Sequence, residues 1–391
     1  MYDVIVAGAG PAGSAAAQTC AAAGLKTLVI EEHGTIGYPV QCAGLLSLAA
    51  FQECRVSDRS ILNSITGARL ISSAGSQLTF DAGIPKAYVV DRGGLDFEMA
   101  QTAADSGAEF RTKTSVIGIN GTSLLTRGIE GRNEFSFRIL IAADGARSTV
   151  ARLLGVRRAK SYLAGIQADI PYRMAEHLVH IYPDAANDFF GYAIPVGNGR
   201  ARIGLCSGRG AKEKFAAFAR HFTDKNVHLV TGTVPLGVMP RTYGHRTLFC
   251  GDAAGFAKPT SGGGVYTGIR SARHAAAVAV ACCEDDRFDD GALSPYETLW
   301  KKDMGNMLES GFRFFRLRSR ISPEHTDKII RALNNPEVIG TIVQYGDMDR
   351  PETLIKKLML KPAVVSALGS LVRPGFLSIF SKRSPGKPPA S

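Results

Sequence analysis

The sequence predicts an α/β fold with a Rossmann-like dinucleotide-binding domain, an inserted antiparallel β-sheet domain and a C-terminal helical region. Three observations predict this class. A strand, a glycine-rich turn and an alanine-rich helix open the chain, short alternating strands fill its middle, and an amphipathic, basic helical pattern begins at Pro295. The expected bounds are 1–60, 84–160 and 235–290 for the discontinuous nucleotide-binding domain, 61–83 and 161–234 for the inserted domain, 291–382 for the helical region and 383–391 for a disordered tail.

The opening segment carries a complete dinucleotide fingerprint. A buried strand over residues 2–7 leads into the glycine-rich residues 8–13, and the helix that follows ends at Gly24. Gly8 allows the tight turn out of the strand, Gly10 lets the backbone approach a pyrophosphate, and Gly13 lets helix and strand pack closely. A second strand then ends at Glu31, whose carboxylate suits the hydroxyl groups of an adenosine ribose.

The middle of the chain alternates between strands and loops. A loop over residues 34–44 is expected to lie over a site, and residues 68–72 and 77–80 are expected to form a small hairpin outside the first domain. Helices are expected over 95–106, 212–221 and 266–283, and successive strands of the inserted sheet over 165–170, 177–182, 190–195 and 201–206.

Composition limits the class of protein further. The 391 residues are 45% hydrophobic and 21% charged, which provides for a large core and two or three packed units. The seven cysteines form no CxxC pair, so the sequence predicts neither a disulfide framework nor a metal or iron–sulfur site, and a reducing compartment fits best. The first strand begins at once, so no signal peptide is expected.

The positive charge is concentrated at the C-terminal end. Residues 301–391 contain 16 Lys and Arg against 8 Asp and Glu, which accounts for +8 of the formal net charge of +11. Such a bias suits an anionic partner, either phospholipid or nucleic acid, and equally suits a solvated basic face. No nucleic-acid-binding module is present and the chain has one Trp, so no nucleic acid partner is expected.

Three turn stations follow parallel-type strands. The first is the glycine fingerprint, the second is Asp144-Gly145, and the third is Gly251-Asp252, which is followed by a glycine run at 262–264. Open α/β sheets bind their ligands at the carboxyl ends of such strands. One station alone is more often a plain turn, but three in this order indicate one shared ligand site.

With these stations in order, residues 2–283 resemble the group-2 flavoproteins, which have the para-hydroxybenzoate hydroxylase-type fold and bind FAD. The resemblance implies that the fingerprint holds the ADP half, that Arg92 lies near the phosphate and ribityl region, and that Asp252 bonds the ribityl chain. The glycine run would bring N–H groups to the pyrimidine end of the flavin, where negative charge collects on reduction. The cofactor-binding residues implied in this way are Gly8, Gly10, Ala12, Gly13, Glu31, Glu32, Cys42, Ala43, Gly44, Arg92, Asp144, Gly145, Gly251, Asp252, Gly262, Gly263 and Gly264.

Two segments, 38–44 and 251–264, are similar to those of geranylgeranyl reductases. That family carries a Tyr-x-Trp-x-Phe-Pro strand beside its substrate, and the matching segment 190–195 keeps aromatic residues at two positions but lacks the Trp. The resemblance implies an apolar substrate slot, and ordinary sheet core is an equally good interpretation of the same residues. Cys42 is either a proton donor or shape-setting residue over the flavin, or an inert buried thiol. The residues expected to contact substrate are Phe190, Tyr192, Ile194 and Pro195, with Phe189 beside them.

The function implied by this resemblance is FAD-dependent reduction of C=C bonds in the geranylgeranyl chains of membrane-lipid precursors, with hydride from flavin N5 and a proton from elsewhere. The alternative is an FAD-dependent monooxygenase of an aromatic or quinone substrate on the same fold. No second nucleotide fingerprint is present, so an external donor such as NAD(P)H, ferredoxin or F420H2 must dock transiently. We expect a cytoplasmic monomer, peripheral to the inner face of the membrane, with residues 312–318 and 363–372 as candidate interfacial segments or as helices packed on the protein.

Overall fold

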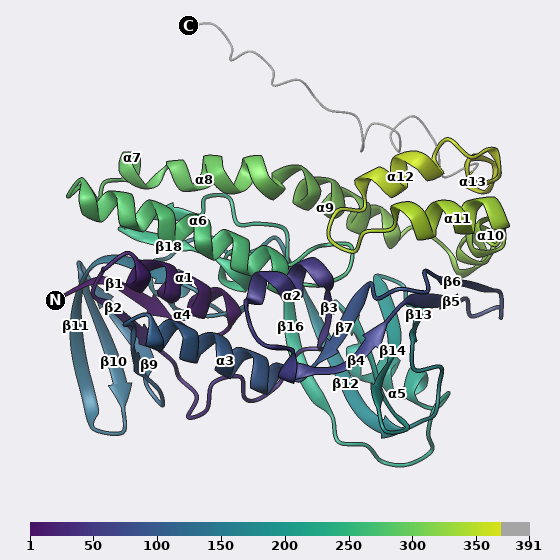
Figure 1. The fold of residues 1–391 in the computed structure, drawn as a ribbon, viewed down its shortest axis with the longest axis horizontal. Helices are drawn as coiled ribbons and strands as arrows, with labels where there is room; N and C mark the ends of the chain where they lie inside the picture. The colour runs from purple at the N-terminus through teal and green to yellow at the C-terminus, as the bar shows by residue number, and fades with distance from the viewer. Residues whose placement is uncertain (369–391) are drawn as a thin grey trace, which may run out of the picture.

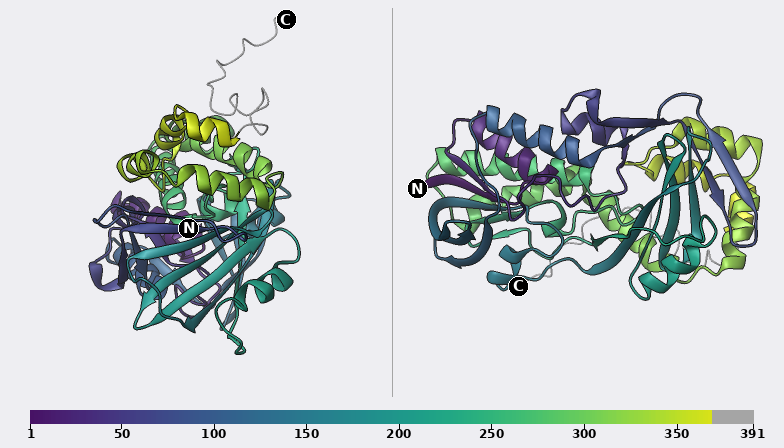
Figure 2. Two further views of the ribbon diagram at one scale, coloured as in Figure 1. Left: turned by 90° about the vertical axis from the view of Figure 1, so that its right-hand side faces the viewer. Right: turned by 90° about the horizontal axis from the view of Figure 1, so that it is seen from below.

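The two larger sheets lie side by side, and the C-terminal helices form a layer over both. The structure is a computed structural model that describes residues 1–368. The N-terminal sheet and the inserted sheet occupy the two ends of an elongated body, and helices from the last third of the chain run along both (Figures 1 and 2). The α/β class with an inserted sheet and a helical C-terminal region is confirmed for these residues.

The N-terminal sheet is built on parallel strands. Its order is β17-β18-β11-β1-β2-β8, and every neighbouring pair from β18 to β8 is parallel. A hairpin of β9 and β10 extends it by pairing with the first half of β11. The strands are β1 (Tyr2–Ala7), β2 (Thr27–Ile30), β8 (Glu109–Arg111), β9 (Ser115–Asn120), β10 (Ser123–Gly128), β11 (Gly131–Ala142), β17 (Tyr243–Gly244) and β18 (Thr247–Phe249).

Three helices cover this sheet. Helix α1 (Pro11–Ala22) packs between α3 (Arg92–Asp105) and α6 (Val265–Glu284), and the short α4 (Thr149–Leu153) follows β11. Small side chains line the buried faces of α1 and α6, which lets the two helices approach closely and keeps the fingerprint turn near the start of α6. The strands beneath are fully buried, as parallel strands covered by helices must be.

The inserted sheet has seven strands in the order β16-β12-β15-β14-β13-β5-β6. The expected hairpin of β5 and β6 joins its edge, and the β13–β5 pair is parallel, whereas the sequence predicted an antiparallel sheet. The reason is that β5 arrives from a distant part of the chain and is not joined to β13 by a hairpin. The strands are β5 (Gly67–Ile71), β6 (Gln77–Asp81), β12 (Ser161–Pro171), β13 (Leu178–Ala186), β14 (Phe189–Gly197), β15 (Arg200–Ser207) and β16 (Val230–Leu236).

A small sheet joins the two halves. Its strands β3 (Leu45–Ser47), β7 (Ala87–Val90) and β4 (Ile61–Ile65) are antiparallel, and α2 (Leu48–Cys54) and a 3-10 turn (Asp58–Ser60) fill the connection. Helix α5 (Ala211–Ala219) covers the opposite face of the inserted sheet. The sequence pattern gave no indication of this third sheet, because its strands are short and two of them flank loops.

The C-terminal helices form the upper layer of Figure 1. They pack on α6 and then on the β5–β6 edge of the inserted sheet. None of the helices within residues 1–368 is long and apolar enough to cross a membrane. The predicted disordered tail and the end of the 363–372 segment lie outside the described residues. The elements are α7 (Asp290–Leu293), α8 (Pro295–Trp300), a π-helical turn η3 (Lys301–Gly305), α9 (Asn306–Arg318), α10 (Pro323–Leu333), α11 (Pro336–Tyr345), α12 (Glu352–Leu358) and α13 (Pro362–Leu368).

Candidate active site

The three turn stations of the sequence meet at one edge of the N-terminal sheet. Strands β1, β11 and β18 are neighbours, and their last residues, Ala7, Ala142 and Phe249, stand in register. The turns that leave these strands are also bonded to one another, since the Ala143 N–H donates to the Ala7 carbonyl at 2.9 Å. The stations therefore form the continuous floor of a single site.

The fingerprint glycines have different tasks. Gly8 has φ +97°, and a Cβ there would lie 2.4 Å from the Ala143 carbonyl oxygen. A Cβ on Gly13 would lie 1.9 Å from the Gly8 carbonyl oxygen, so both positions require glycine for the fold itself. A Cβ on Gly10 would meet no atom within 4 Å. The space over Gly10 is thus left open for a ligand.

Two helices begin at this edge with unsatisfied N–H groups. Helix α1 starts after Gly10 and α6 after Gly264, and neither has a side-chain cap or an acidic residue in its first turn. Helix N-termini attract anions through their N–H groups and dipole. This edge therefore presents free N–H groups and the positive end of a helix dipole at the starts of both α1 and α6.

Glu31 is placed at the end of β2 next to the fingerprint. One carboxylate oxygen accepts the Ala9 N–H at 2.8 Å and the other accepts the His33 N–H at 2.9 Å. Glu32 is exposed on the surface. Ala12 faces the third station, because a Cβ on Gly251 would lie 2.9 Å from the Ala12 Cβ. A larger residue than Ala12 would push α1 away from that station.

Two acidic side chains supply acceptors to the floor. Asp144 accepts the Val150 N–H at 2.9 Å with one oxygen, and its other oxygen is buried without a partner among residues 1–368. Burial raises the pKa of Asp144. Burial also raises the pKa of Asp252, to about 6, against an opposing effect of the Arg92 charge. An orphaned buried acceptor is costly, and hydroxyl groups of a ligand would satisfy it.

Arg92 opens helix α3 beside this floor. Its guanidinium pairs with Asp96 through two hydrogen bonds, at 3.0 and 2.9 Å, and lies beside the Cys42 thiol. The bidentate pair fixes the orientation of the guanidinium. Arg92 is consequently held between the acidic floor and the Cys42 loop.

The loop that carries Cys42 is fastened to the inserted sheet. The Cys42 carbonyl accepts the Gln167 side-chain amide at 3.1 Å, and the Gln167 oxygen accepts the Tyr192 hydroxyl at 2.9 Å. The Ala43 carbonyl accepts a hydrogen bond from Arg202 at 2.9 Å. Gly44 has φ +73°, and a Cβ there would lie 2.7 Å from the Val90 carbonyl oxygen. Backbone contacts on both sides thus hold the half-buried Cys42 in place.

The predicted substrate residues on β14 separate into two groups. Phe190 stacks on Phe189 with ring centroids 4.6 Å apart, and the Phe189 ring lies 3.5 Å from the position of a Cβ on Gly262. Tyr192 uses its hydroxyl to hold Gln167. Ile194 and Pro195 are buried, and Ile194 belongs to a core cluster between β14 and the small sheet. At about 3.3 Å per residue, Ile194 lies about 13 Å along the strand from Phe190.

Sequence reasoning missed several residues of the site. Phe312 and Phe315 of α9 face inward, since Phe315 contacts Phe189 at 6.2 Å between centroids and the Phe312 ring lies against Gly237. Their spacing of three on an amphipathic helix was the available signal, but it does not tell which surface covers them. Phe312 and Phe315 of the 312–318 segment thus pack partly against the protein.

Lys258 was also missed. It is buried between the third station and the glycine run, its Nζ donates to the Met348 carbonyl at 3.0 Å, and it pairs with Asp349. Ser47, after the Cys42 loop, donates its hydroxyl to the same carboxylate. No local signal links these residues, because they come from three distant segments.

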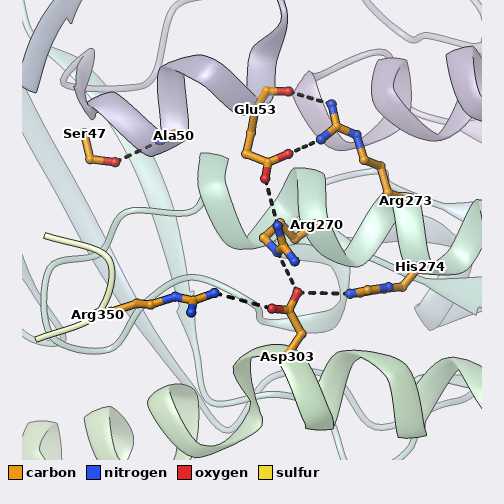
Figure 3. Close-up of polar contacts among 8 residues, drawn as sticks. All are labelled: Ser47, Ala50, Glu53, Arg270, Arg273, His274, Asp303 and Arg350. Carbon is orange, nitrogen blue, oxygen red and sulfur yellow. Dashed lines mark hydrogen bonds and ion pairs between the residues drawn. The ribbon is translucent and has the colours of Figure 1, made fainter. Parts of the chain in front are cut away.

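A second polar network lies on the outer side of α6 (Figure 3). Arg270 bonds both Glu53 at 2.8 Å and Asp303 at 2.5 Å, and His274 reaches Asp303 at 3.0 Å. Arg350 approaches the same carboxylate at 3.7 Å. The network ties α2, α6, η3 and the segment before α12 together, so its carboxylates and cations are already satisfied by one another.

Comparison with known proteins agrees with this geometry. Residues 1–299 match the family described as FAD binding domain. The chain is 31% identical over 363 residues to digeranylgeranylglycerophospholipid reductase 2 of Methanothermobacter thermautotrophicus, covering 86% of this chain and 93% of the relative. It is 28% identical over 399 residues to the digeranylgeranylglycerophospholipid reductase of Methanocella arvoryzae, covering 95% and 99%.

Solved structures give the same family. A geranylgeranyl bacteriochlorophyll reductase-like protein from Thermoplasma acidophilum superposes with a TM-score of 0.84 at 26% identity, over 95% of this chain and 99% of that one. The p-nitrophenol 4-monooxygenase of Pseudomonas putida, with a TM-score of 0.68 at 16% identity over 88% and 97%, shares the fold alone. Fold and site thus define an FAD-dependent oxidoreductase. Within this class, the chain belongs to the geranylgeranyl reductase family.

Proposed function

We propose that the protein reduces carbon–carbon double bonds in the geranylgeranyl chains of membrane-lipid precursors. The observation that carries this proposal is the place of the Phe189 ring beside Gly262, because it puts the aromatic pair of Phe189 and the half-buried Phe190 next to the glycine run at the start of α6. An apolar chain lying along Phe190 would be held next to a flavin. The names of the relatives support the same substrate class.

Each part of the site has a task in this proposal. FAD, when bound, supplies a hydride to one carbon of the alkene. The open space over Gly10 and the N-terminus of α1 take the pyrophosphate, and the unpartnered oxygen of Asp144 accepts from a cofactor hydroxyl. The N–H groups at residues 262–264 stabilise negative charge at the end of the ring. We assign the proton for the second carbon to the Cys42 thiol, which the Gln167 contact holds near Arg92.

Association with a membrane surface is the second component of the proposal. Lys356 and Lys357 of α12 are exposed, and they belong to residues 301–391, which account for +8 of the formal net charge of +11. Basic surfaces bind anionic headgroups at about 1 kcal/mol per cation near the membrane. We propose a monomer at the cytoplasmic face of the membrane that receives electrons from a transiently docked donor.

A monooxygenase reaction is the alternative, because proteins of that activity share the fold. The two reactions differ in their need for oxygen, because only the monooxygenase reaction requires it. The flavin of the purified protein is reduced anaerobically with dithionite, and digeranylgeranylglyceryl phospholipid is added in mixed micelles. Reoxidation of the flavin together with product masses that rise in steps of two hydrogens is the expected result.

The matched control for this experiment is the same phospholipid with saturated phytanyl chains, which has the same headgroup and no alkene. It is expected to leave the flavin reduced. A flavin that stays reduced with both lipids until air is admitted would contradict the reductase proposal and favour the monooxygenase.

A further inference from the structure

Four phenylalanines form a continuous row between β14 and α9, which we call the aromatic row: Phe312, Phe315, Phe189 and Phe190. Successive ring centroids are 6.0, 6.2 and 4.6 Å apart. Phe189 is fully buried and the other three are half-buried. The row touches residues of both the inserted sheet and the 251–264 segment, since it packs with Leu163, Leu236 and Ala257. Its three half-buried rings thus offer apolar surface close to the proposed flavin position.

A single guanidinium lies at one end of the aromatic row. Arg318, the last residue of α9, places its guanidinium carbon 5.7 Å from the centroid of Phe189 and 5.4 Å from that of Phe190. One of its five N–H donors is used on the Pro183 carbonyl at 2.8 Å. Stacking on aromatic faces offers a guanidinium a modest attraction and leaves its in-plane donors available.

The carboxylates near Arg318 are engaged elsewhere. Asp184 accepts from the backbone and hydroxyl of Ser73 at 2.9 and 2.7 Å, and Asp188 accepts from Ser207 and Gly208. Within residues 1–368, no carboxylate comes within ion-pair distance of the Arg318 guanidinium. Burial lowers the pKa of Arg318 to about 10, so the group remains cationic at neutral pH.

The energetic situation of Arg318 therefore differs from that of arginines that pair with a carboxylate. Other partly buried arginines, such as Arg92 and Arg202, are neutralised by bidentate contact with a carboxylate. Arg318 loses water without gaining such a partner, and this cost is recovered when an anion binds. A planar fork of donors is the geometry that suits phosphate oxygens.

We propose that Arg318 binds the phosphate at the head of the prenyl substrate, while the aromatic row holds the chain that leads from it towards the 262–264 glycine run. This inference rests on the proposed function and deepens it, because it makes the enzyme selective for phosphorylated prenyl compounds. The Arg318 guanidinium and Gly262 both lie beside the ring of Phe189. The anionic head and the reacting part of the chain are thereby both held close to this one side chain.

The test compares two ligands that differ only in the phosphate. Geranylgeranyl phosphate and geranylgeraniol are titrated into FAD-loaded protein, and their dissociation constants are measured by calorimetry for wild type, Arg318→Gln and Arg316→Gln. Arg316 lies on the same helix but is exposed, so it is the control for loss of one positive charge. We expect Arg318→Gln to weaken the binding of geranylgeranyl phosphate roughly 10- to 100-fold and to leave the binding of geranylgeraniol unchanged. Arg316→Gln should bind both ligands as the wild type does.

Further arms keep the result interpretable. Arg318→Lys, which retains the charge without the fork, is expected to show an intermediate loss and replaces Arg318→Gln if that variant fails to fold. Inorganic phosphate alone is titrated as well, and if it binds more weakly than geranylgeranyl phosphate, the site recognises a lipid headgroup. Equal affinity for inorganic phosphate and geranylgeranyl phosphate would mean a site for a free anion and would overturn the headgroup assignment. An Arg318→Gln variant that loses equal affinity for geranylgeranyl phosphate and for geranylgeraniol would overturn it too. These measurements require no turnover, so they remain valid if alkene reduction itself is not observed.

Discussion

Lys258 and Asp349 form a buried ion pair although 91 residues separate them in the sequence. Lys258 belongs to the segment that leads to the glycine run, and Asp349 lies between α11 and α12. Because Ser47 bonds the same carboxylate, the C-terminal helices hold two walls of the active site through one side chain. The helical region is thus fixed by buried polar contacts to the segments that lead to the glycine run and away from the Cys42 loop.

Breaking this pair from one side should be costly. Asp349→Leu leaves the Lys258 ammonium buried without its counter-charge, and we expect a loss of about 3–5 kcal/mol in the free energy of unfolding, measured by urea denaturation of the FAD-loaded protein. The double variant Lys258→Met/Asp349→Leu removes both charges and should recover most of the loss. Equal stabilities of the single and double variants would show that the pair is not coupled.

The fingerprint glycines allow a matched pair of alanine substitutions. Gly10→Ala adds a Cβ into open space but puts Ala at the N-cap of α1, so the flavin-free protein should lose no more than about 1 kcal/mol in its free energy of unfolding while FAD binds about tenfold more weakly or worse. Gly13→Ala drives a Cβ into the Gly8 carbonyl and should destabilise the flavin-free protein by about 1–3 kcal/mol. Urea titration and FAD titration check the two effects separately. Unchanged FAD affinity in Gly10→Ala would remove the pyrophosphate from this position.

Asp252 makes the stability of the flavin-free protein depend on pH. Its pKa is raised by burial from 3.8 to about 6, so the folded state favours the protonated carboxyl. The stabilising contribution is present below about pH 4 and is lost as pH rises through 6. The free energy of unfolding of Asp252→Asn, measured by urea denaturation, should therefore rise relative to that of the wild type as the pH rises, by up to about 3 kcal/mol between pH 4 and pH 8. A difference between the two proteins that does not vary with pH would contradict the raised pKa.

The position of Cys42 should depend on Gln167. Gln167→Leu removes the donor to the Cys42 carbonyl, a contribution of about 1 kcal/mol, and alkylation of Cys42 by a maleimide should become about fivefold faster in the FAD-loaded protein. Tyr192→Phe keeps that donor and removes only the outer hydrogen bond, so its effect should be smaller. Mass spectrometry of the labelled peptide gives the rate for this cysteine alone. If Tyr192→Phe accelerated the alkylation of Cys42 more than Gln167→Leu, the loop would be held by other contacts.

The sequence was sufficient where a residue type is required by backbone geometry. Gly8 and Gly13 are fixed by close approaches that no other residue permits, so the fingerprint is visible in the sequence, and the three stations follow from the rule that parallel strands bind ligands at their carboxyl ends. The confirmed fold class rests on these positions. A local pattern of this kind does not depend on what the rest of the chain does.

The sequence was insufficient where the site depends on pairings between distant segments. Gln167 lies 125 residues from the Cys42 carbonyl that it holds, and an isolated Gln in a strand carries no sign of such a partner. The alternation of side chains on β14 predicted that Ile194 lies on the same face as Phe190. The two residues are four positions apart along the strand, however, and Ile194 packs in a different core cluster. The inward direction of Phe315 likewise became evident only from its contact with Phe189.

The strand order of the N-terminal sheet also governs how the chain can fold. The central strand β11 pairs Phe137 with Tyr2, and its other neighbour, β18, begins only at Thr247. The sheet beneath the active site therefore cannot be completed until well over half of the chain has left the ribosome. Contacts of such large sequence separation slow folding and leave hydrophobic strands exposed in the meantime. We expect the nascent protein to require chaperones and FAD to bind only as a late step of its maturation.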